Sequence, residues 1–370
     1  MNKKIAISIL IFLLLFSTIT VAKKKNNYFT VVSEKSGDVI FETAMDVSVG
    51  DYYINEQNKK YKIIKVNEKE GIAKFEETVK LITDKDNLFA ISQGLLAEKE
   101  KKLVSLYHTH SSESYKPTSG TDSEPKGDIH AVSEALAKAL RKKGIEVDYN
   151  ESNHNPHDGG AYERSRRTAT RLVRKRPDAI FDVHRDGVPN AKEYVTNVNG
   201  KKIAKVRLVV GRQNPQMQVN DKFAKQIKAV SDKYYPGLIK GIYYAKGKYN
   251  QDLSPRSMLL EMGTHVISAE QAIASTDVLS NVINKLLYGG TKEGGGGTTT
   301  SKTKANENSG AINSIIVILA IVIIGGGLLL AANEGGFNGA VKRIKSVTSG
   351  ELSNSLGIKK DEDENGDEDK

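Results

Sequence analysis

Three clusters of polar residues each come directly after an apolar run of the kind that forms a buried strand. The clusters are Tyr107-His108-Thr109-His110-Ser111-Ser112-Glu113-Ser114-Tyr115, Phe181-Asp182-Val183-His184-Arg185-Asp186-Gly187 and Leu259-Leu260-Glu261-Met262-Gly263. A zinc hydrolase needs two neutral imidazoles, often a carboxylate, an open position for water and a separate general base. That set is supplied by His110, Glu113, His184 and Glu261. The His110-x-x-Glu113 spacing lets one loop or helical turn present two ligands.

Other histidines compete for the ligand positions. Alternation along the first strand puts His108 on the same side as His110, so His108 is either a further ligand or a core residue. His130, at the start of a predicted helix, is an alternative to Glu113. The remaining histidines lie in loop-like sequence, and we expect no chemical role for them: His154, His157 and His265.

The composition restricts the chemistry. The chain of 370 residues has seven histidines and no cysteine. This excludes disulfides, a thiol nucleophile, a zinc finger and an iron–sulfur cluster, so a metal must be held by histidine and carboxylate alone. No Gly-x-Ser-x-Gly motif is present, which disfavours a serine hydrolase.

The elements that must position these residues alternate between strand and helix over residues 93–289. Predicted strands at 103–107, 145–147, 179–183, 206–211 and 257–260 alternate with predicted helices at 129–143, 161–174, 220–233 and 269–287. This order predicts an α/β domain with a mainly parallel sheet flanked by helices. Ligands collect at the carboxyl ends of strands in such folds, which is where the polar clusters begin.

Residues 26–92 read as a small all-β module that precedes this domain. Five short segments rich in β-branched and aromatic residues are separated by turn sequences such as Ser36-Gly37-Asp38. The module has no histidine, and we expect it to be a spacer or docking module.

Two apolar runs predict transmembrane segments. The first, Ile5 to Ala22, makes residues 1–25 a signal peptide or an N-terminal anchor. The second, Ile315 to Ala332, makes residues 314–333 a membrane-spanning helix that follows a flexible linker at 290–313. Basic residues just past the second run predict a cytoplasmic tail at 334–370 and an extracytoplasmic domain before it.

The net charge of +10 indicates an anionic partner. Since the topology places the basic domain outside the membrane, we expect that partner to be a wall polymer such as peptidoglycan, and no nucleic acid.

Several motifs together resemble the stage II sporulation protein P family. They are the first two polar clusters, Val209-Val210-Gly211 with Asn214-Pro215, Tyr249-Asn250-Gln251-Asp252-Leu253-Ser254, Leu260-Glu261-Met262-Gly263, Tyr162-Glu163-Arg164-Ser165-Arg166 and Tyr235-Pro236-Gly237. They occur in the right order at plausible spacing over about residues 100–289.

The resemblance implies a membrane-anchored peptidoglycan hydrolase with a fold related to the zinc-dependent N-acetylmuramoyl-L-alanine amidases. Such an enzyme cuts the amide between N-acetylmuramic acid and L-alanine, with endopeptidase activity on cross-links, during engulfment in sporulation. Its partners are the stage II sporulation proteins D and M. The resemblance makes His110 and His184 zinc ligands and Glu261 the general base. Glu113 is the third ligand by the local motif, with Glu124 or His130 as alternatives.

Three points stay open at this stage. Arg185 either orients the carboxylate of the stem peptide or pairs with Asp186. The C-terminal span and acidic tail depart from the family pattern, so a role in vegetative wall remodelling competes with sporulation. A zinc carboxypeptidase or endopeptidase acting on wall peptides, or a non-catalytic wall-binding anchor, is the alternative function.

Overall fold

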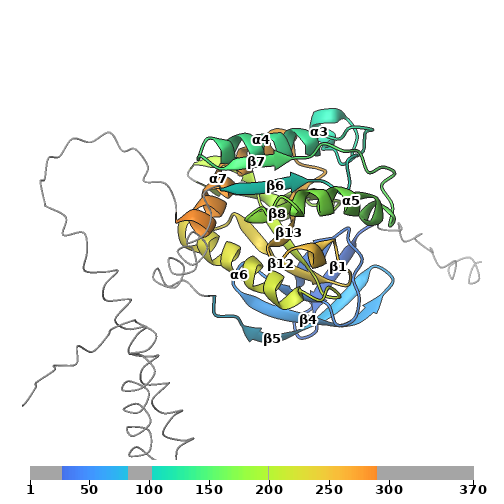
Figure 1. The fold of residues 1–370 in the computed structure, drawn as a ribbon. Coiled ribbons are helices and arrows are strands. Elements are labelled where there is room, and N and C mark those ends of the chain that lie inside the picture. Colours follow the sequence, from blue (N-terminus) through green and yellow to red (C-terminus); the bar gives the residue numbers. More distant parts are fainter. Residues whose placement is uncertain (1–26, 82–101, 199, 290–370) are drawn as a thin grey trace, which may run out of the picture. The chain divides into compact units, whose positions relative to one another are not determined.

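A mixed sheet of 11 strands runs through the computed structural model, which describes residues 27–81, 102–198 and 200–289 (Figure 1). In the order in which they lie across the sheet, the strands are β2 (Val39–Thr43), β1 (Phe29–Ser33), β5 (Glu70–Thr78), β4 (Lys59–Asn67), β3 (Tyr52–Ile54), β12 (Ile239–Ala245), β11 (Val206–Gly211), β13 (Ser257–Thr264), β8 (Ala179–Asp186), β6 (Leu103–Tyr107) and β7 (Glu146–Tyr149).

The expected parallel arrangement holds for most of the half that runs from β12 to β7. Within it β11–β12, β13–β8, β8–β6 and β6–β7 are parallel pairs, whereas β11 and β13 are antiparallel. The N-terminal strands pair antiparallel except for β1 with β5. The sheet is therefore mixed.

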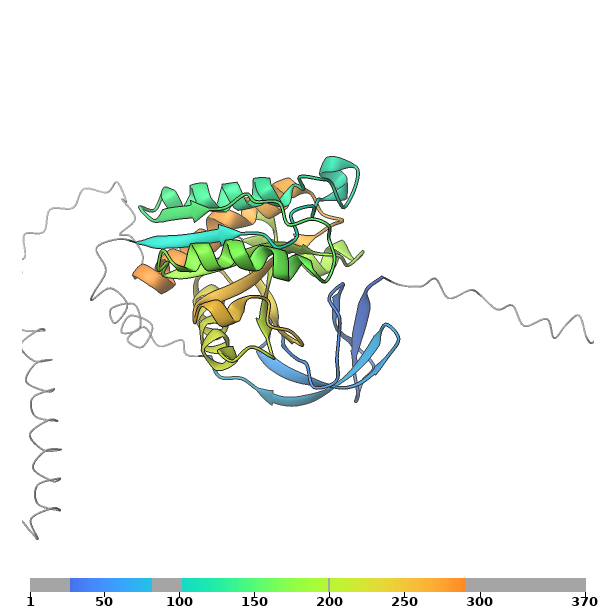
Figure 2. The same ribbon diagram turned by 45° about the vertical axis from the view of Figure 1, so that its right-hand side comes forward.

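The five N-terminal strands form as predicted, and they continue the same sheet. Strand β3 pairs antiparallel with β12, with Tyr53 opposite Tyr243. Tyr53 stacks on Phe41 at a centroid distance of 4.3 Å, and its hydroxyl donates to the carbonyl of Lys240. In Figure 2 these strands, drawn in blue, lie at the end of the sheet away from the helix at Ile129–Arg141.

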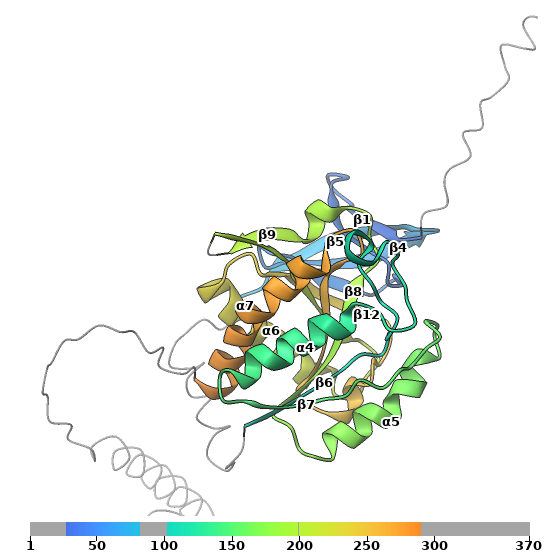
Figure 3. The same cartoon turned by 90° about the horizontal axis from the view of Figure 1, so that it is seen from above.

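Helices cover both faces of the sheet. α4 (Ile129–Arg141), α6 (Met217–Tyr234) and α7 (Ala269–Tyr288) share one hydrophobic core with β6, β8, β11, β12 and β13. α5 (Ala161–Val173) packs on the opposite face, where Ala169 and Leu172 contact Tyr107 and Ile180. Figure 3 shows α4 and α7 side by side, with α5 on the other side of β6 and β7.

Local sequence explains where α7 begins and ends. Ser268 and Gln271 form a capping box, in which each side chain accepts a hydrogen bond from the other residue's backbone N–H. Gly289 ends the helix in the left-handed region at φ +73°, a conformation that glycine adopts without steric cost.

The predicted helices are confirmed to within a few residues at each end, and several elements were not anticipated. Besides β12, these are α3 (Lys116–Ser119), the 3-10 turns η1 (Ala191–Tyr194) and η2 (Gln251–Leu253), and the hairpin of β9 (Val195–Val198) and β10 (Lys201–Ala204). The predicted strands at 179–183 and 257–260 both run further, to Asp186 and Thr264. This extension places His184 and Glu261 inside strands.

Within the described residues no helix is both long enough and apolar enough to span a membrane. The two predicted spans, at 1–25 and 314–333, lie outside those residues.

Candidate metal centre

The site is built on the face of the sheet that α5 covers. Alternation along β8 puts Asp182, His184 and Asp186 on this face. In the neighbouring strand, Glu261 is paired in register with His184, and it is paired in turn with Arg207 of β11. Cross-strand pairing therefore lines up a histidine, a carboxylate and a cation across three adjacent strands.

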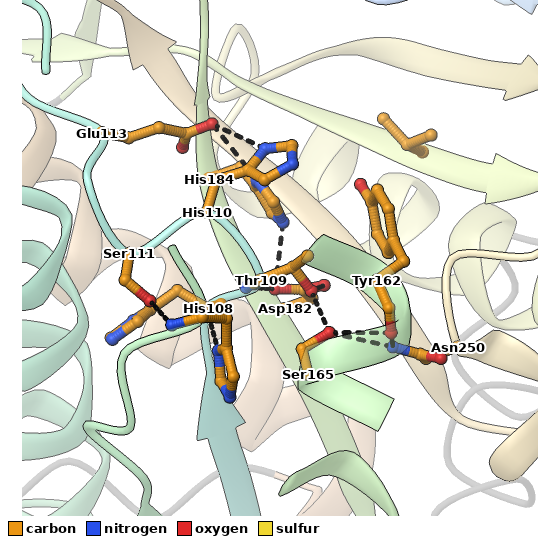
Figure 4. Close-up of polar contacts among 12 residues, drawn as sticks. His108, Thr109, His110, Ser111, Glu113, Tyr162, Ser165, Asp182, His184 and Asn250 are labelled. Carbon is orange, nitrogen blue, oxygen red and sulfur yellow. Dashed lines mark hydrogen bonds and ion pairs between the residues drawn. The ribbon is translucent and has the colours of Figure 1, made fainter. Parts of the chain in front are cut away.

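His110, Glu113 and His184 converge on one point (Figure 4). The Oε1 atom of Glu113 lies 3.2 Å from Nδ1 of His110 and 3.4 Å from Nδ1 of His184. One donor atom from each of the three residues lies within 4.8 Å of the other two.

These separations fit a tetrahedral zinc ion. Donor atoms that lie 2.0–2.1 Å from a tetrahedral ion are about 3.3 Å apart. The second oxygen of Glu113 accepts the backbone N–H of Arg185 at 2.8 Å, which fixes the orientation of the carboxylate. Two imidazoles and one carboxylate leave a fourth position for water, as in catalytic zinc sites. The predicted ligand set thus comes together with Glu113 as its carboxylate.

Asp182 orients His184 from behind. Its Oδ1 lies 3.0 Å from Nε2 of His184, which leaves Nδ1 of the same ring to face Glu113. Asp182 also accepts the backbone N–H of Thr109 at 2.8 Å and the Thr109 hydroxyl at 2.6 Å. A carboxylate behind a ligating histidine fixes the tautomer of the ring and raises its basicity.

The charges of the ligand cluster stabilise one another. Burial alone would raise the pKa of Glu113, but the imidazoles of His184 and His110 outweigh it and hold that pKa well below its usual value. Burial alone would lower the pKa of His184, but the carboxylates of Asp182 and Glu113 raise it well above its usual value. Without a metal, the cluster therefore favours a protonated His184 between carboxylates, and a metal ion bound there would replace that proton.

Glu261 is a buried carboxyl group suited to proton transfer. Its side chain is 4% exposed, and its Oε2 atom has no hydrogen-bond partner among the described residues. Burial and the neighbouring Asp186 raise its pKa to about 8. A group with a pKa near the working pH both accepts and returns a proton readily, as a general base must.

Asp186 connects the metal centre to the N-terminal strands. It forms a buried ion pair with Arg207 at 2.7 Å and accepts the backbone N–H of Ala44 at 2.9 Å. Arg207 in turn donates to the carbonyl of Glu42 and the hydroxyl of Thr43. The strands predicted to be a spacer are therefore hydrogen-bonded to the strand that carries His184.

Arg185 points away from the ligand cluster. Alternation puts its side chain on the other face of β8, where its guanidinium donates to the backbone carbonyls of Ser114, Asp122 and Asp186. It contacts the carbonyl and not the carboxylate of Asp186. Its observed contact with the site is the backbone bond to Glu113, and the guanidinium anchors the loop that presents that ligand.

The alternative ligands lie elsewhere. The ring of His108 packs on that of His130 at 4.0 Å, and both are apart from the converging group. Burial and the neighbouring His130 lower the pKa of His108 to about 3. The backbone N–H of Glu124 donates to the carbonyl of Ser112, and its side chain is not part of the group.

Two aromatic side chains that the sequence did not mark as site residues border the ligands. His157 stacks on His110 with a centroid distance of 3.8 Å. Tyr162, the second residue of α5, lies against both ligating rings, at 5.5 Å from His110 and 6.3 Å from His184. Burial and the negative charge of Asp182 raise the pKa of the Tyr162 phenol well above its usual value. A ring placed on two ligands by tertiary packing leaves no spacing signal in the sequence.

Among solved structures, two amidases are similar to this chain. One is the CwlD amidase from Clostridioides difficile in complex with the GerS lipoprotein, with 14% identity, 50% of this chain and 98% of that chain covered, and a TM-score of 0.36. The other is N-acetylmuramoyl-L-alanine amidase AmiC2 of Nostoc punctiforme, which is 14% identical. The match covers 51% of this chain and 97% of that chain, with a TM-score of 0.33. Such low identities and scores do not assign an activity.

The sequence comparisons are more specific. Stage II sporulation protein P of Bacillus subtilis (strain 168) is 29% identical over 248 residues, which are 62% of this chain, and the chain spans 61% of the length of that relative. The family model for stage II sporulation protein P matches residues 11–284. This match covers more than half of the chain and confirms the resemblance carried by the motifs, so the chain belongs to the stage II sporulation protein P family.

Proposed function

We propose that this protein is a zinc-dependent peptidoglycan hydrolase that cleaves the amide between N-acetylmuramic acid and L-alanine. The observation that carries the proposal is the convergence of His110, Glu113 and His184 beside the buried carboxyl of Glu261. Membership of the stage II sporulation protein P family supports a role in sporulation.

His110, Glu113 and His184 would hold the metal through two imidazole nitrogens and one carboxylate oxygen. When bound, zinc supplies a Lewis acid that activates water and polarises a carbonyl oxygen. Glu261 takes the proton of the attacking water and delivers it to the leaving nitrogen. Asp182 holds His184 in the tautomer that presents Nδ1 to the metal. Arg185 keeps the Glu113 loop in place through its bonds to backbone carbonyls.

The proposed setting is the outer face of a cell membrane. The apolar runs at 1–25 and 314–333 would anchor the chain, with the metal centre outside and the tail at 334–370 in the cytoplasm. The basic chain would face the anionic wall, and stage II sporulation proteins D and M are the proposed partners.

Digestion of purified peptidoglycan by the full chain tests this proposal. We expect mass spectrometry of the products to show stem peptides with a free L-alanine amino group, and expect Glu261→Gln and His184→Ala to abolish their release. New ends only within cross-links would indicate an endopeptidase, and tight wall binding without any release would indicate an anchor. Undiminished lysis by both variants would refute the assigned centre.

A further inference from the structure

The hydroxyl of Tyr162 is the feature of the site that the proposed mechanism does not use. The Tyr162 ring is nearly parallel to that of His184, at 21°, and is tilted by 68° to that of His110. In Figure 4 the hydroxyl end of the ring points to the side of the site on which Glu113 and His184 lie.

This hydroxyl is free to bind a ligand. It has no hydrogen-bond partner within the described part of the chain, although hydroxyls in such sites usually have one. The Tyr162 side chain is partly exposed, as is that of His110, whereas His184 and Glu261 are buried. A ligand bound at the exposed side of the metal centre would therefore lie beside both the His110 and Tyr162 rings.

The backbone that carries this ring is also held by hydrogen bonds. The carbonyl of Tyr162 accepts a hydrogen bond from the Asn250 amide at 3.0 Å, and the same amide donates to the Ser165 hydroxyl at 3.1 Å. The Thr109 hydroxyl donates to Asp182, so Ser165 is the donor in its 2.9 Å bond to Thr109. One continuous network therefore sets the positions of both the Tyr162 backbone and the His184 ring, as Figure 4 shows.

The charges around the ligands indicate what the hydroxyl would bind. The side chains of Glu113, Asp182 and Glu261 are carboxyl groups, and the Arg185 guanidinium is bonded to backbone carbonyls on the other face of the strand. Amide hydrolysis places negative charge on the carbonyl oxygen, and a neutral donor aimed at that oxygen stabilises the transition state. The Tyr162 hydroxyl is such a donor.

We propose that the Tyr162 hydroxyl donates a hydrogen bond to the carbonyl oxygen of the scissile amide as that oxygen becomes negatively charged. The proton stays on the phenol throughout, while Glu261 moves the proton of water. This assignment rests on the proposed hydrolase function and adds a catalytic residue to it.

The test compares Tyr162→Phe with Tyr249→Phe in the full, zinc-loaded chain. Tyr249 packs on Tyr162 at 5.2 Å, but its hydroxyl donates to the carbonyl of Lys246. Each variant therefore loses one hydroxyl and keeps its ring. We expect kcat to fall by about 10- to 100-fold in Tyr162→Phe, with KM within about twofold, because a hydrogen bond to a developing charge is lost. Tyr249→Phe should keep at least about half of the wild-type kcat.

A second readout does not depend on turnover. A phosphinate that replaces the scissile amide mimics the charged, tetrahedral carbon, and its affinity should fall in Tyr162→Phe by about the same factor as kcat. Zinc content and melting temperature should equal those of the wild type. An unchanged kcat, a change confined to KM, or a loss of zinc would overturn the role of Tyr162.

Wild type and Glu261→Gln, measured alongside, separate the two proposals. If the wild type releases no product, the hydrolase function fails and the Tyr162 role falls with it. If the wild type cleaves, Glu261→Gln does not, and Tyr162→Phe equals the wild type, only the Tyr162 role fails.

Discussion

Glu261 is the cross-strand partner of His184 in the parallel pairing of β13 with β8. Residues paired in this way project from the same face of a sheet, and neighbouring strands lie about 4.8 Å apart. The distance between the proposed ligand His184 and the proposed base Glu261 is thus set by strand register. A shift of one residue would turn Glu261 toward the face covered by α4, α6 and α7.

Glu261→Gln should reduce kcat for peptidoglycan cleavage by about 10²- to 10⁴-fold. The amide has the shape of the carboxyl group but cannot take a proton from water. Zinc content, measured by atomic absorption, should not change, because Glu261 is not one of the converging ligands. A loss of zinc equal to the loss of activity would make Glu261 a ligand instead.

Asp182→Asn should weaken zinc binding by about 10- to 100-fold, because the carboxylate that orients His184 is lost. Titration with a competing chelator measures the affinity. Thr109→Val removes the hydroxyl bonds to Asp182 and Ser165 but keeps the backbone bond to Asp182, and it should have a smaller effect in the same direction. Equal zinc affinity in wild type and Asp182→Asn would show that the orienting contact is dispensable.

Removal of zinc should lower the melting temperature. A metal that binds only the folded chain adds about 2.7 kcal/mol of stability at 100 times its dissociation constant, which corresponds to about 5–10 °C here. Differential scanning fluorimetry with and without a chelator gives the shift, and added zinc should restore it. His110→Ala should show almost no response to zinc, and a full response in that variant would place the ion elsewhere.

Arg207→Met should destabilise the fold by about 3–5 kcal/mol, since it leaves the buried Asp186 without its ion-pair partner. The free energy of unfolding in urea measures the loss. Adding Asp186→Asn should recover part of it because the unpaired charge is then removed. The exposed pair of Lys126 and Glu151 is the control, and Lys126→Met should cost about 1 kcal/mol or less.

At acidic pH the Arg166–Asp252 pair should no longer contribute to the stability of the fold. Arg166 donates to both carboxylate oxygens at 3.0 and 2.6 Å and lowers the pKa of Asp252 below its usual 3.8. A carboxyl with a depressed pKa stabilises the fold above its unfolded-state pKa and loses that effect as pH falls through its folded-state pKa. Asp252→Asn should therefore cost up to about 1 kcal/mol at pH 7 and almost nothing near pH 2. An equal cost at both values would rule out the charge as its source.

The sequence predicted the strands whose residues are mostly apolar or β-branched, such as Val206–Gly211, whose bounds are those observed. It did not reveal β12, whose Lys240 and Gly241 interrupt the apolar pattern. Those residues are used by the tertiary structure: Lys240 pairs with Glu193, and Gly241 lets the Tyr53 ring and the backbone of β3 approach closely. Such long-range contacts have no local signature.

The candidate ligands were predictable because each follows an apolar strand sequence directly, and His110 and Glu113 are also three residues apart. The roles of Asp182 and Tyr162 were not. Asp182 acts through the tautomer of another residue, and Tyr162 reaches the site because α5 packs over that face of the sheet. Both depend on the register and packing of segments far apart in the chain.

The bond from Ala44 to Asp186 has a consequence for dissecting this protein. From the sequence, a fragment that starts at residue 93 would contain the whole predicted α/β domain. It would leave β12 as an open edge, prone to aggregation, and would strip Arg207 of its contacts with Glu42 and Thr43. If that fragment were inactive, the cause would be the disrupted sheet. The result would not show that the N-terminal strands bind substrate.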